Sequence, residues 1–159
     1  MPIATGSKSH LLVVDDEPGN IRILSNILAE DYALSAATNA EQALALAKNQ
    51  LPDLVLLDMV MPDMDGLAVC EALKAMDETS DIPVIFVTSM DDPENEERGL
   101  LAGAVDYIRK PISPPIVKAR VKIHIQNLLT VRFLESLLSS QTTSLEDAKT
   151  KAKALLVFA

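Results

Sequence analysis

Short apolar segments that end abruptly at polar residues constrain the fold of this chain more than any other feature. Segments 11–14, 54–57 and 83–87 are almost wholly apolar, and polar or turn-forming residues follow each of them. Apolar runs of this length, bounded by turn signals, are typical of strands that are buried on both faces of a sheet. Segments 32–37 and 105–109 mix apolar and polar residues, which predicts strands at the edges of the sheet.

Segments with helical periodicity separate these predicted strands. After the first strand, Ile21, Leu24 and Leu28 recur at helical spacing, and Thr38 with Glu41 matches a capping box for the next helix. Five strands in strict alternation with five helices predict a parallel sheet with helices on both faces. We therefore expect the α/β class, as a flavodoxin-like doubly wound sheet of order 2-1-3-4-5 whose last helix is extended.

Composition narrows the class of protein. The chain has 159 residues, of which 48% are hydrophobic, and this is enough for one domain with a real core. It has one cysteine and no apolar run of membrane-spanning length, so we expect a cytoplasmic protein with no membrane partner. The net charge of −9 argues against nucleic acid binding to a basic face of this region.

Carboxylates follow two of the central strands. Asp15 and Asp16 come directly after the first strand, and Asp58 follows the third. These strands are neighbours in the expected order, so the three carboxylates should meet at the carboxyl edge of the sheet. Like charges at close range repel, and a hard divalent cation with oxygen ligands relieves the repulsion. Magnesium, Mg²⁺, suits such a site because it binds through one or two carboxylates together with waters.

Two further polar residues are expected at the same edge. Thr88 follows the fourth strand and Lys110 follows the fifth. An acidic cluster with a cation, a hydroxyl and an ammonium group provides the positioning and charge neutralisation that phosphoryl transfer needs. The carboxylate left to act as nucleophile is Asp58.

With these motifs in the same order, the chain resembles the receiver domains of bacterial two-component response regulators. The resemblance covers about residues 10–129 and implies a phosphorylation-dependent switch that takes a phosphoryl group from a histidine kinase or phosphotransfer protein. It also implies that the domain is no enzyme beyond its own phosphoryl transfer and slow self-dephosphorylation. The matching segments are 13–17, 56–58, 61–66, 87–89, 103–104, 107 and 110–111.

The resemblance implies a role for each site residue. Asp16 and Asp58 would bind Mg²⁺ directly together with the backbone carbonyl of Val60, and Asp15 would assist through a water. Lys110, which precedes a cis proline in this family, would pair with the phosphoryl oxygens. The readout residues would be Thr88, which hydrogen-bonds the phosphoryl group, and Tyr107, which swings inward behind it. Phosphorylation would then reshape the surface formed by the fourth helix, the fifth strand and the fifth helix.

The last predicted helix is longer than the fold requires. From Pro114 onwards no helix breaker occurs, and apolar residues recur at coiled-coil spacing at 131, 134, 138, 145, 148, 152 and 155. We expect a receiver domain at 8–130 and, at 131–159, a helical linker that forms a coiled coil toward a missing output domain. The resemblance suggests a cyclic-dinucleotide enzyme or a kinase as that output, and a homodimer through the switch surface, the long helix or both. A disordered tail is the alternative, because 139–144 is polar and a poor helix former.

Three other functions compete with the switch. Phosphatases of the haloacid dehalogenase type also use a strand-end aspartate, but they carry the motif Asp-x-Asp. In this chain the position of the second aspartate is occupied by Val60. A flavodoxin-like cofactor binder needs a loop rich in Ser, Thr and Gly after the first strand, where this chain has Asp15 and Asp16. A degenerate receiver that acts only as a scaffold is disfavoured by the complete set of acids with Thr88 and Lys110.

Overall fold

Strands and helices alternate along the chain as the sequence predicts. The computed structural model describes residues 7–62, 65–89 and 93–141, and within them it contains five strands and five helices. In order they are β1 (His10–Val14), α1 (Pro18–Leu28), β2 (Ala33–Ala37), α2 (Ala40–Gln50), β3 (Leu54–Leu57), α3 (Gly66–Ala75), β4 (Val84–Thr88), α4 (Pro93–Leu101), β5 (Asp106–Arg109) and α5 (Pro114–Gln141).

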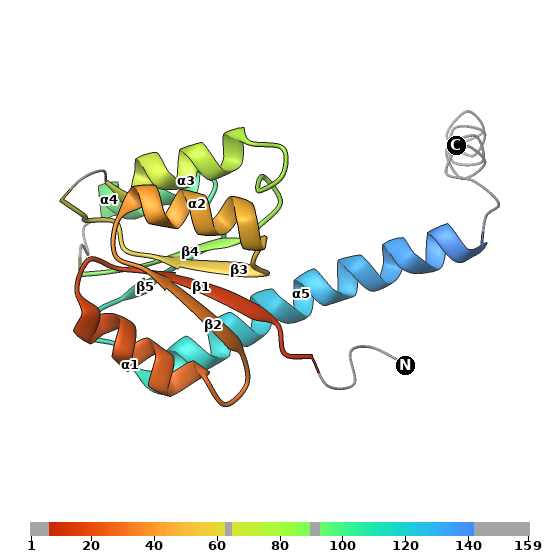
Figure 1. The fold of residues 1–159 in the computed structure, drawn as a ribbon, viewed down its shortest axis with the longest axis horizontal. Coiled ribbons are helices and arrows are strands. Elements are labelled where there is room, and N and C mark those ends of the chain that lie inside the picture. The colour runs from red at the N-terminus through yellow and green to blue at the C-terminus, as the bar shows by residue number, and fades with distance from the viewer. Residues whose placement is uncertain (1–6, 63–64, 90–92, 142–159) are drawn as a thin grey trace. The chain divides into compact units, whose positions relative to one another are not determined.

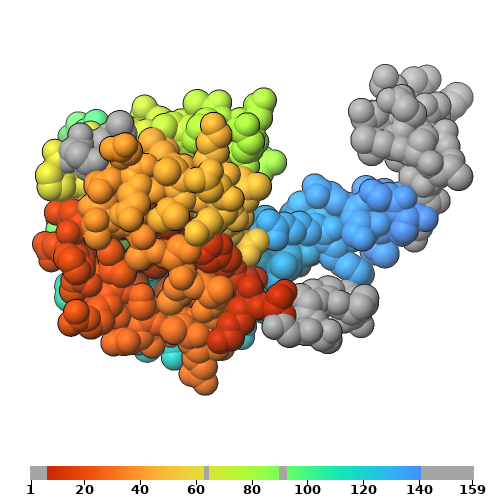
Figure 2. Space-filling view, viewed as in Figure 1, coloured from red at the N-terminus to blue at the C-terminus, as the bar shows by residue number. Residues whose placement is uncertain are grey.

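The strands form one parallel sheet of order β2-β1-β3-β4-β5, which confirms the flavodoxin-like topology. α1 and the first turns of α5 lie on one face, and α2, α3 and α4 lie on the other (Figure 1). Figure 2 shows the same side of the molecule in space-filling form, with the N-terminal half of the chain toward the viewer. The residues of β3 and β4 are all buried, whereas the edge strands β2 and β5 are mixed, as their composition predicts.

The core lies on both faces of the central strands. Its largest fully buried side chain is Phe86 of β4, which belongs to one buried cluster with a leucine and a valine from each of β1 and β3. On the α5 face, Val117 and Val121 are completely buried. Burial of each large apolar side chain contributes roughly 1.5–3 kcal/mol, so these strands are held rigidly and their carboxyl ends are fixed.

Side-chain caps fix the starts of α2 and α3. The predicted cap Thr38 is wrong by one residue, because Asn39 is the N-cap of α2 and accepts a hydrogen bond from the N–H of Gln42 at 2.8 Å. The Gln42 side chain accepts in turn from the N–H of Thr38 at 3.0 Å, so a reciprocal cap exists in a shifted register. Asp65 caps α3 through the N–H of Ala68 at 2.8 Å.

The chain divides into two units, Met1–Ile123 and His124–Ala159, and α5 begins in the first and continues in the second. The last helix is extended, as expected. Of the predicted seam positions, Val131, Leu134 and Leu138 lie in α5 and are about half exposed, whereas 145, 148, 152 and 155 lie outside the described residues. Among the helices that the structure describes, none combines the length and the hydropathy that a membrane crossing requires.

Candidate functional site

Three carboxylates meet at the carboxyl edge of the sheet, where the sequence predicts them. Asp15 and Asp16 follow β1, Asp58 follows β3, and the paired register of the two strands brings their ends side by side. One oxygen from each carboxylate lies within 4.8 Å of the other two. Asp15 and Asp58 are only 2% and 7% exposed, whereas Asp16 is partly exposed. Solvent therefore reaches the cluster mainly from the side of Asp16.

Hydrogen bonds from the backbone orient Asp58. Its own N–H donates to the carbonyl of Val14 at 2.9 Å, which joins the end of β3 to β1. Its Oδ1 accepts from the N–H of Val60 at 3.1 Å, and its Oδ2 accepts from Lys110 Nζ at 3.3 Å. Both carboxylate oxygens are thus fixed by donors, and the side chain has little rotational freedom.

Asp15 is held as firmly. Its Oδ1 accepts from the N–H of Glu17 at 2.9 Å and from the side-chain amide of Asn20 at 3.5 Å. Its Oδ2 accepts from Lys110 Nζ at 2.8 Å. Sequence reasoning missed Asn20, although its position in the first turn of α1, just after the two aspartates, was a usable signal.

Lys110 reaches the site from β5, on the far side of β4. Its N–H donates to the carbonyl of Thr88 at 3.0 Å, which fixes the end of β5 against β4. Its ammonium group forms ion pairs with Asp15 and Asp58, both largely shielded from water. The Lys110–Pro111 peptide bond is cis, as the family resemblance implies.

Burial and charge determine the titration of this ion pair. Burial raises the pKa of Asp58, the N–H of Val60 and the charge of Lys110 offset this rise in part, and the charge of Asp15 adds to it. Burial acts to lower the pKa of Lys110, but its hydrogen bond to Asp15 and the charges of both carboxylates outweigh burial and raise the pKa. The site therefore keeps Lys110 charged and disfavours the ionised form of Asp58.

The donor set fits a magnesium ion. Mg²⁺ binds oxygen at about 2.1 Å, so two oxygens on one ion lie at most about 4.2 Å apart. Within the observed limit of 4.8 Å, two carboxylates can bind directly while the third acts through a water, with small adjustments. Hard carboxylate oxygens without sulfur or imidazole ligands favour Mg²⁺ over softer metals.

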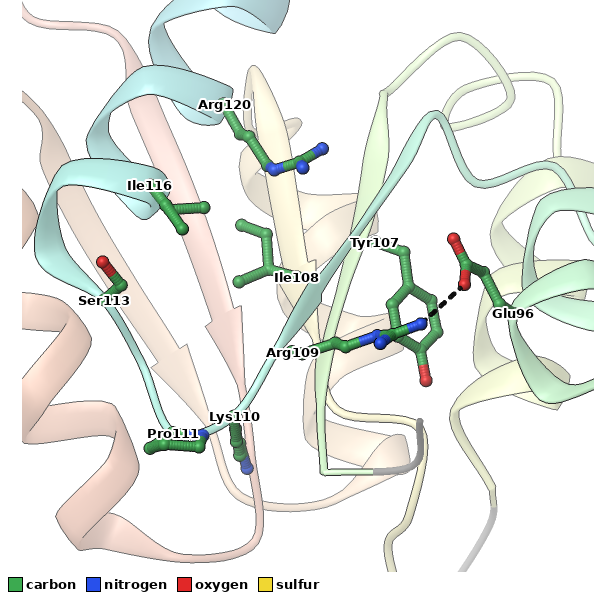
Figure 3. A pocket seen from close by; sticks show the side chains of 9 residues that line it. All are labelled: Glu96, Tyr107, Ile108, Arg109, Lys110, Pro111, Ser113, Ile116 and Arg120. Carbon is green, nitrogen blue, oxygen red and sulfur yellow. Dashed lines mark hydrogen bonds and ion pairs between the residues drawn. The ribbon is translucent and has the colours of Figure 1, made fainter. Parts of the chain in front are cut away.

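The other predicted residues surround this cluster. Thr88 is the last residue of β4 and fully buried, and Val60, in the turn after Asp58, is half exposed. Tyr107 is buried on β5 beside Phe86 and is not a member of the acidic cluster. Figure 3 shows Tyr107 and Ile108 on opposite sides of the strand, as strand alternation requires.

A separate cavity of about 490 Å³ lies beside β5 and shares only Lys110 with the cluster described above. On its rim Arg109 pairs with Glu96 of α4 at 3.2 Å (Figure 3), and Arg120 pairs with Asp106 at 2.6 Å. Residues of α4, β5 and the first turns of α5 thus line one continuous surface around the cavity. Its lining residues are Glu96, Tyr107, Ile108, Arg109, Lys110, Pro111, Ser113, Ile116 and Arg120.

A doubly wound sheet whose carboxyl edge carries three aspartates and a lysine defines a phosphoacceptor class of domain, and its acidic triad is typical of the Mg²⁺ site of that class. The chain belongs to the response regulator receiver domain family, whose model matches residues 11–122. Such domains serve two-component signal transduction, act as phosphoacceptors rather than classical enzymes, and have histidine kinases as partners. Family membership selects the receiver hypothesis over the phosphatase and cofactor-binding alternatives.

Curated relatives share this domain within longer chains. A "Probable cyclic di-GMP phosphodiesterase" from Vibrio cholerae is 46% identical over 121 residues, which cover 76% of this chain and 27% of the relative. The "Response regulator PleD" of Caulobacter vibrioides is 43% identical over 115 residues, or 72% of this chain and 25% of that protein. The chain thus spans about a quarter of the length of these two relatives.

Solved structures agree with the fold. A CheY-like receiver domain protein from Methanospirillum hungatei is 30% identical, with a TM-score of 0.73 over 78% of this chain and 98% of its own. The BeF3-activated receiver domain of RstA from Klebsiella pneumoniae is 29% identical, with a TM-score of 0.69 over 74% of this chain and 98% of its own.

Proposed function

We propose that Asp58 is the phosphoryl acceptor of a signalling switch and receives its phosphoryl group from a histidine kinase or a phosphotransfer protein. An oxygen of the Asp58 carboxylate attacks the phosphorus atom, and the bond from phosphorus to the donor breaks. The observation that carries this proposal is the convergence of Asp15, Asp16, Asp58 and Lys110 from three strands at one edge of the sheet. An aspartate that served only as a turn residue would not require two further carboxylates and a lysine beside it.

Mg²⁺ is the proposed cofactor. Asp16 and Asp58 would bind it directly with the backbone carbonyl of Val60, and Asp15 would act through a water, in keeping with the span of the carboxylate oxygens. The ion supplies charge neutralisation at the transferring phosphoryl group. Asp15 and Asp58, which are both held by backbone donors, keep the ligand oxygens in place without the metal.

Lys110, Thr88 and Tyr107 are proposed to sense the phosphoryl group. Lys110 carries a secure positive charge within hydrogen-bond reach of Asp58, so it can pair with an oxygen on the phosphoryl group. The Thr88 hydroxyl lies at the end of the adjacent strand and would bind another oxygen. Tyr107 lies on β5 and lines the cavity. Its rearrangement would transmit the phosphorylation state of Asp58 to the surface of α4, β5 and α5.

Output is proposed to pass through that surface and through α5. We place the receiver domain at 8–130 and a helical linker at 131–159, with an output domain beyond it. The cyclic-di-GMP name of one relative supports a cyclic-dinucleotide enzyme as that output. Exposed Val131, Leu134 and Leu138 support self-association of the linker as a coiled coil. A homodimer through α4, β5 and α5, through the linker, or through both is the expected active state.

Intact-mass spectrometry after incubation with acetyl phosphate tests the acceptor. The wild-type chain should gain the mass of one phosphoryl group when Mg²⁺ is present and gain none in EDTA. Asp58→Asn should gain none in either condition, while Glu78→Gln, which changes an exposed carboxylate outside the cluster, should behave as wild type. Labelling of Asp58→Asn would refute the assignment. Light scattering with and without beryllofluoride measures dimerisation on the same samples.

A further inference from the structure

Gly66, the first residue of α3, lies directly against the main chain that carries Asp58. A Cβ atom at this position would overlap the carbonyl oxygen of Asp58 and would lie only 2.7 Å from the Cα of Met59. Both atoms belong to the backbone, so no rotation of a side chain can relieve the overlap. Gly66 does not have a positive φ, and therefore space rather than backbone torsion requires glycine here.

Hydrogen bonds make this contact part of the acceptor's support. The N–H of Gly66 donates to the carbonyl of Met59 at 2.7 Å, while the N–H of Asp58 donates to Val14 of β1 at 2.9 Å. The two peptides that flank the Asp58–Met59 peptide are therefore anchored, the preceding one to β1 and the following one to the start of α3. The peptide between Met59 and Val60 accepts from Gly66 through its carbonyl and donates to Oδ1 of Asp58 through its N–H at 3.1 Å, so the orientation of the carboxylate depends on where this peptide lies.

The other described glycines lack this feature. An added Cβ at Gly19 would meet no atom within 4 Å. At Gly99 it would meet the side chains of Phe86 and Met59, and at Gly103 it would meet the flexible side chain of Lys74. Only at Gly66, among the glycines that the structure describes, does backbone occupy the space that a side chain would need.

We propose that Gly66 is a positioning residue for phosphoryl transfer, which rests on the proposed role of Asp58 as acceptor. Its missing side chain lets the start of α3 press on the peptide after Asp58 and so fixes both the carboxylate and the Val60 carbonyl. An alanine forces either the peptide or α3 to retreat. Because a misplacement of about 1 Å at a reacting group can cost about 100-fold in rate, even this small change should be measurable.

Gly66→Ala tests the proposal in the full chain, with Gly19→Ala as an uncrowded control. Gly103→Ala is a second control. Its φ of 108° makes an alanine strained there, and the position is distant in sequence from β3, so it tests destabilisation without the contact at Asp58. Initial rates of phosphorylation by acetyl phosphate are compared at a temperature where melting curves show each variant to be folded. Binding of Mg²⁺ is measured on the same proteins by calorimetry.

Folded Gly66→Ala should be phosphorylated about 10- to 100-fold more slowly than wild type and should bind Mg²⁺ more weakly. Gly19→Ala should match wild type, and Gly103→Ala should melt earlier while it keeps the wild-type rate and Mg²⁺ affinity. A folded Gly66→Ala with wild-type rate and affinity overturns the proposal.

If Gly66→Ala does not fold, Asp65→Ala replaces it, since this variant removes the cap at 2.8 Å that anchors the same helix start. A folded Asp65→Ala should then show the slower rate and the weaker Mg²⁺ binding, and wild-type values for both would overturn the proposal. A wild-type chain that gains no phosphoryl group on Asp58 would instead show that the proposed function itself is wrong.

Discussion

Replacing Asp58 with asparagine should stabilise the domain while it abolishes the proposed switch. Three aspartates and one lysine leave the cluster with two uncompensated negative charges. With an effective dielectric constant of about 20, two unit charges within 4.8 Å repel by about 3.5 kcal/mol or more. On the same basis the attraction between Asp58 and Lys110 at 3.3 Å is worth about 5 kcal/mol.

The two repulsions that Asp58 experiences therefore outweigh its one attraction. Because Asp16 is partly exposed, solvent screens its share, and the expected gain from Asp58→Asn is about 1–2 kcal/mol. For a domain of this size that gain raises the melting temperature by roughly 2–8 °C. The asparagine side chain keeps an oxygen that can accept from the N–H of Val60, so the turn need not rearrange.

Thermal unfolding at pH 7 in EDTA and low salt measures this effect, with Glu78→Gln as the control for the loss of one charge. Mg²⁺ at ten times its dissociation constant should stabilise wild type by about 1.4 kcal/mol and stabilise Asp58→Asn less. A melting temperature of Asp58→Asn at or below that of wild type in EDTA would refute the electrostatic argument. Equal stabilisation of both proteins by Mg²⁺ would refute the assignment of Asp58 as a ligand.

The raised pKa of Asp58 adds a pH signature to the same experiment. A carboxyl group whose pKa is higher in the folded state binds its proton more tightly there, so its contribution to stability rises as pH falls through the folded-state pKa. At neutral pH the ionised group is a cost that Asp58→Asn avoids. The advantage of Asp58→Asn should therefore shrink as the pH approaches about 4, the ordinary range of an aspartate.

Two further substitutions test the structure. Lys110→Met leaves Asp15 and Asp58 buried without their cation, so it should cost about 3 kcal/mol in urea unfolding, part of which Mg²⁺ should restore; wild-type stability would contradict the role of this ion pair. Leu51→Gly should gain about 1 kcal/mol, because Leu51 ends α2 with a left-handed φ of 47° while its side chain is half exposed. Leu51→Ala keeps the strain and is its control, and an equal gain in both variants would exclude strain relief as the cause.

The sequence was sufficient to predict the topology because the composition of each strand identifies it as central or as an edge strand. Fully buried strands read as continuous apolar runs, and the order of a doubly wound sheet then determines which strand ends are neighbours. That rule correctly placed Asp15, Asp16 and Asp58 together and brought Lys110 to them across β4. Element ends were less certain: the α2 cap moved from Thr38 to Asn39, since both residues can cap and only the packing of the helix decides between them.

Other parts of the site depend on the placement of whole elements against one another. No pattern in the sequence indicates that Lys110 lies closer to Asp15, at 2.8 Å, than to Asp58, at 3.3 Å. The crowding around Gly66 depends on the distance between the start of α3 and the end of β3. A glycine at the start of a helix is often explained by backbone torsions, but Gly66 has no positive φ.

The charges at the cluster explain why the proposed switch needs both a lysine and a metal ion. Phosphorylation adds up to about two negative charges at Asp58. Lys110 already neutralises Asp15 through the shorter of its two contacts, 2.8 Å against 3.3 Å. To pair with a phosphoryl oxygen it must share or leave Asp15, and a buried carboxylate without a counter-charge is costly. Asp15 and Asp16 would hold a divalent cation that compensates for that loss, and Lys110 would then be able to respond to the state of Asp58. On the proposed function, Lys110 would therefore serve as a sensor only with a metal ion bound beside Asp15 and Asp16.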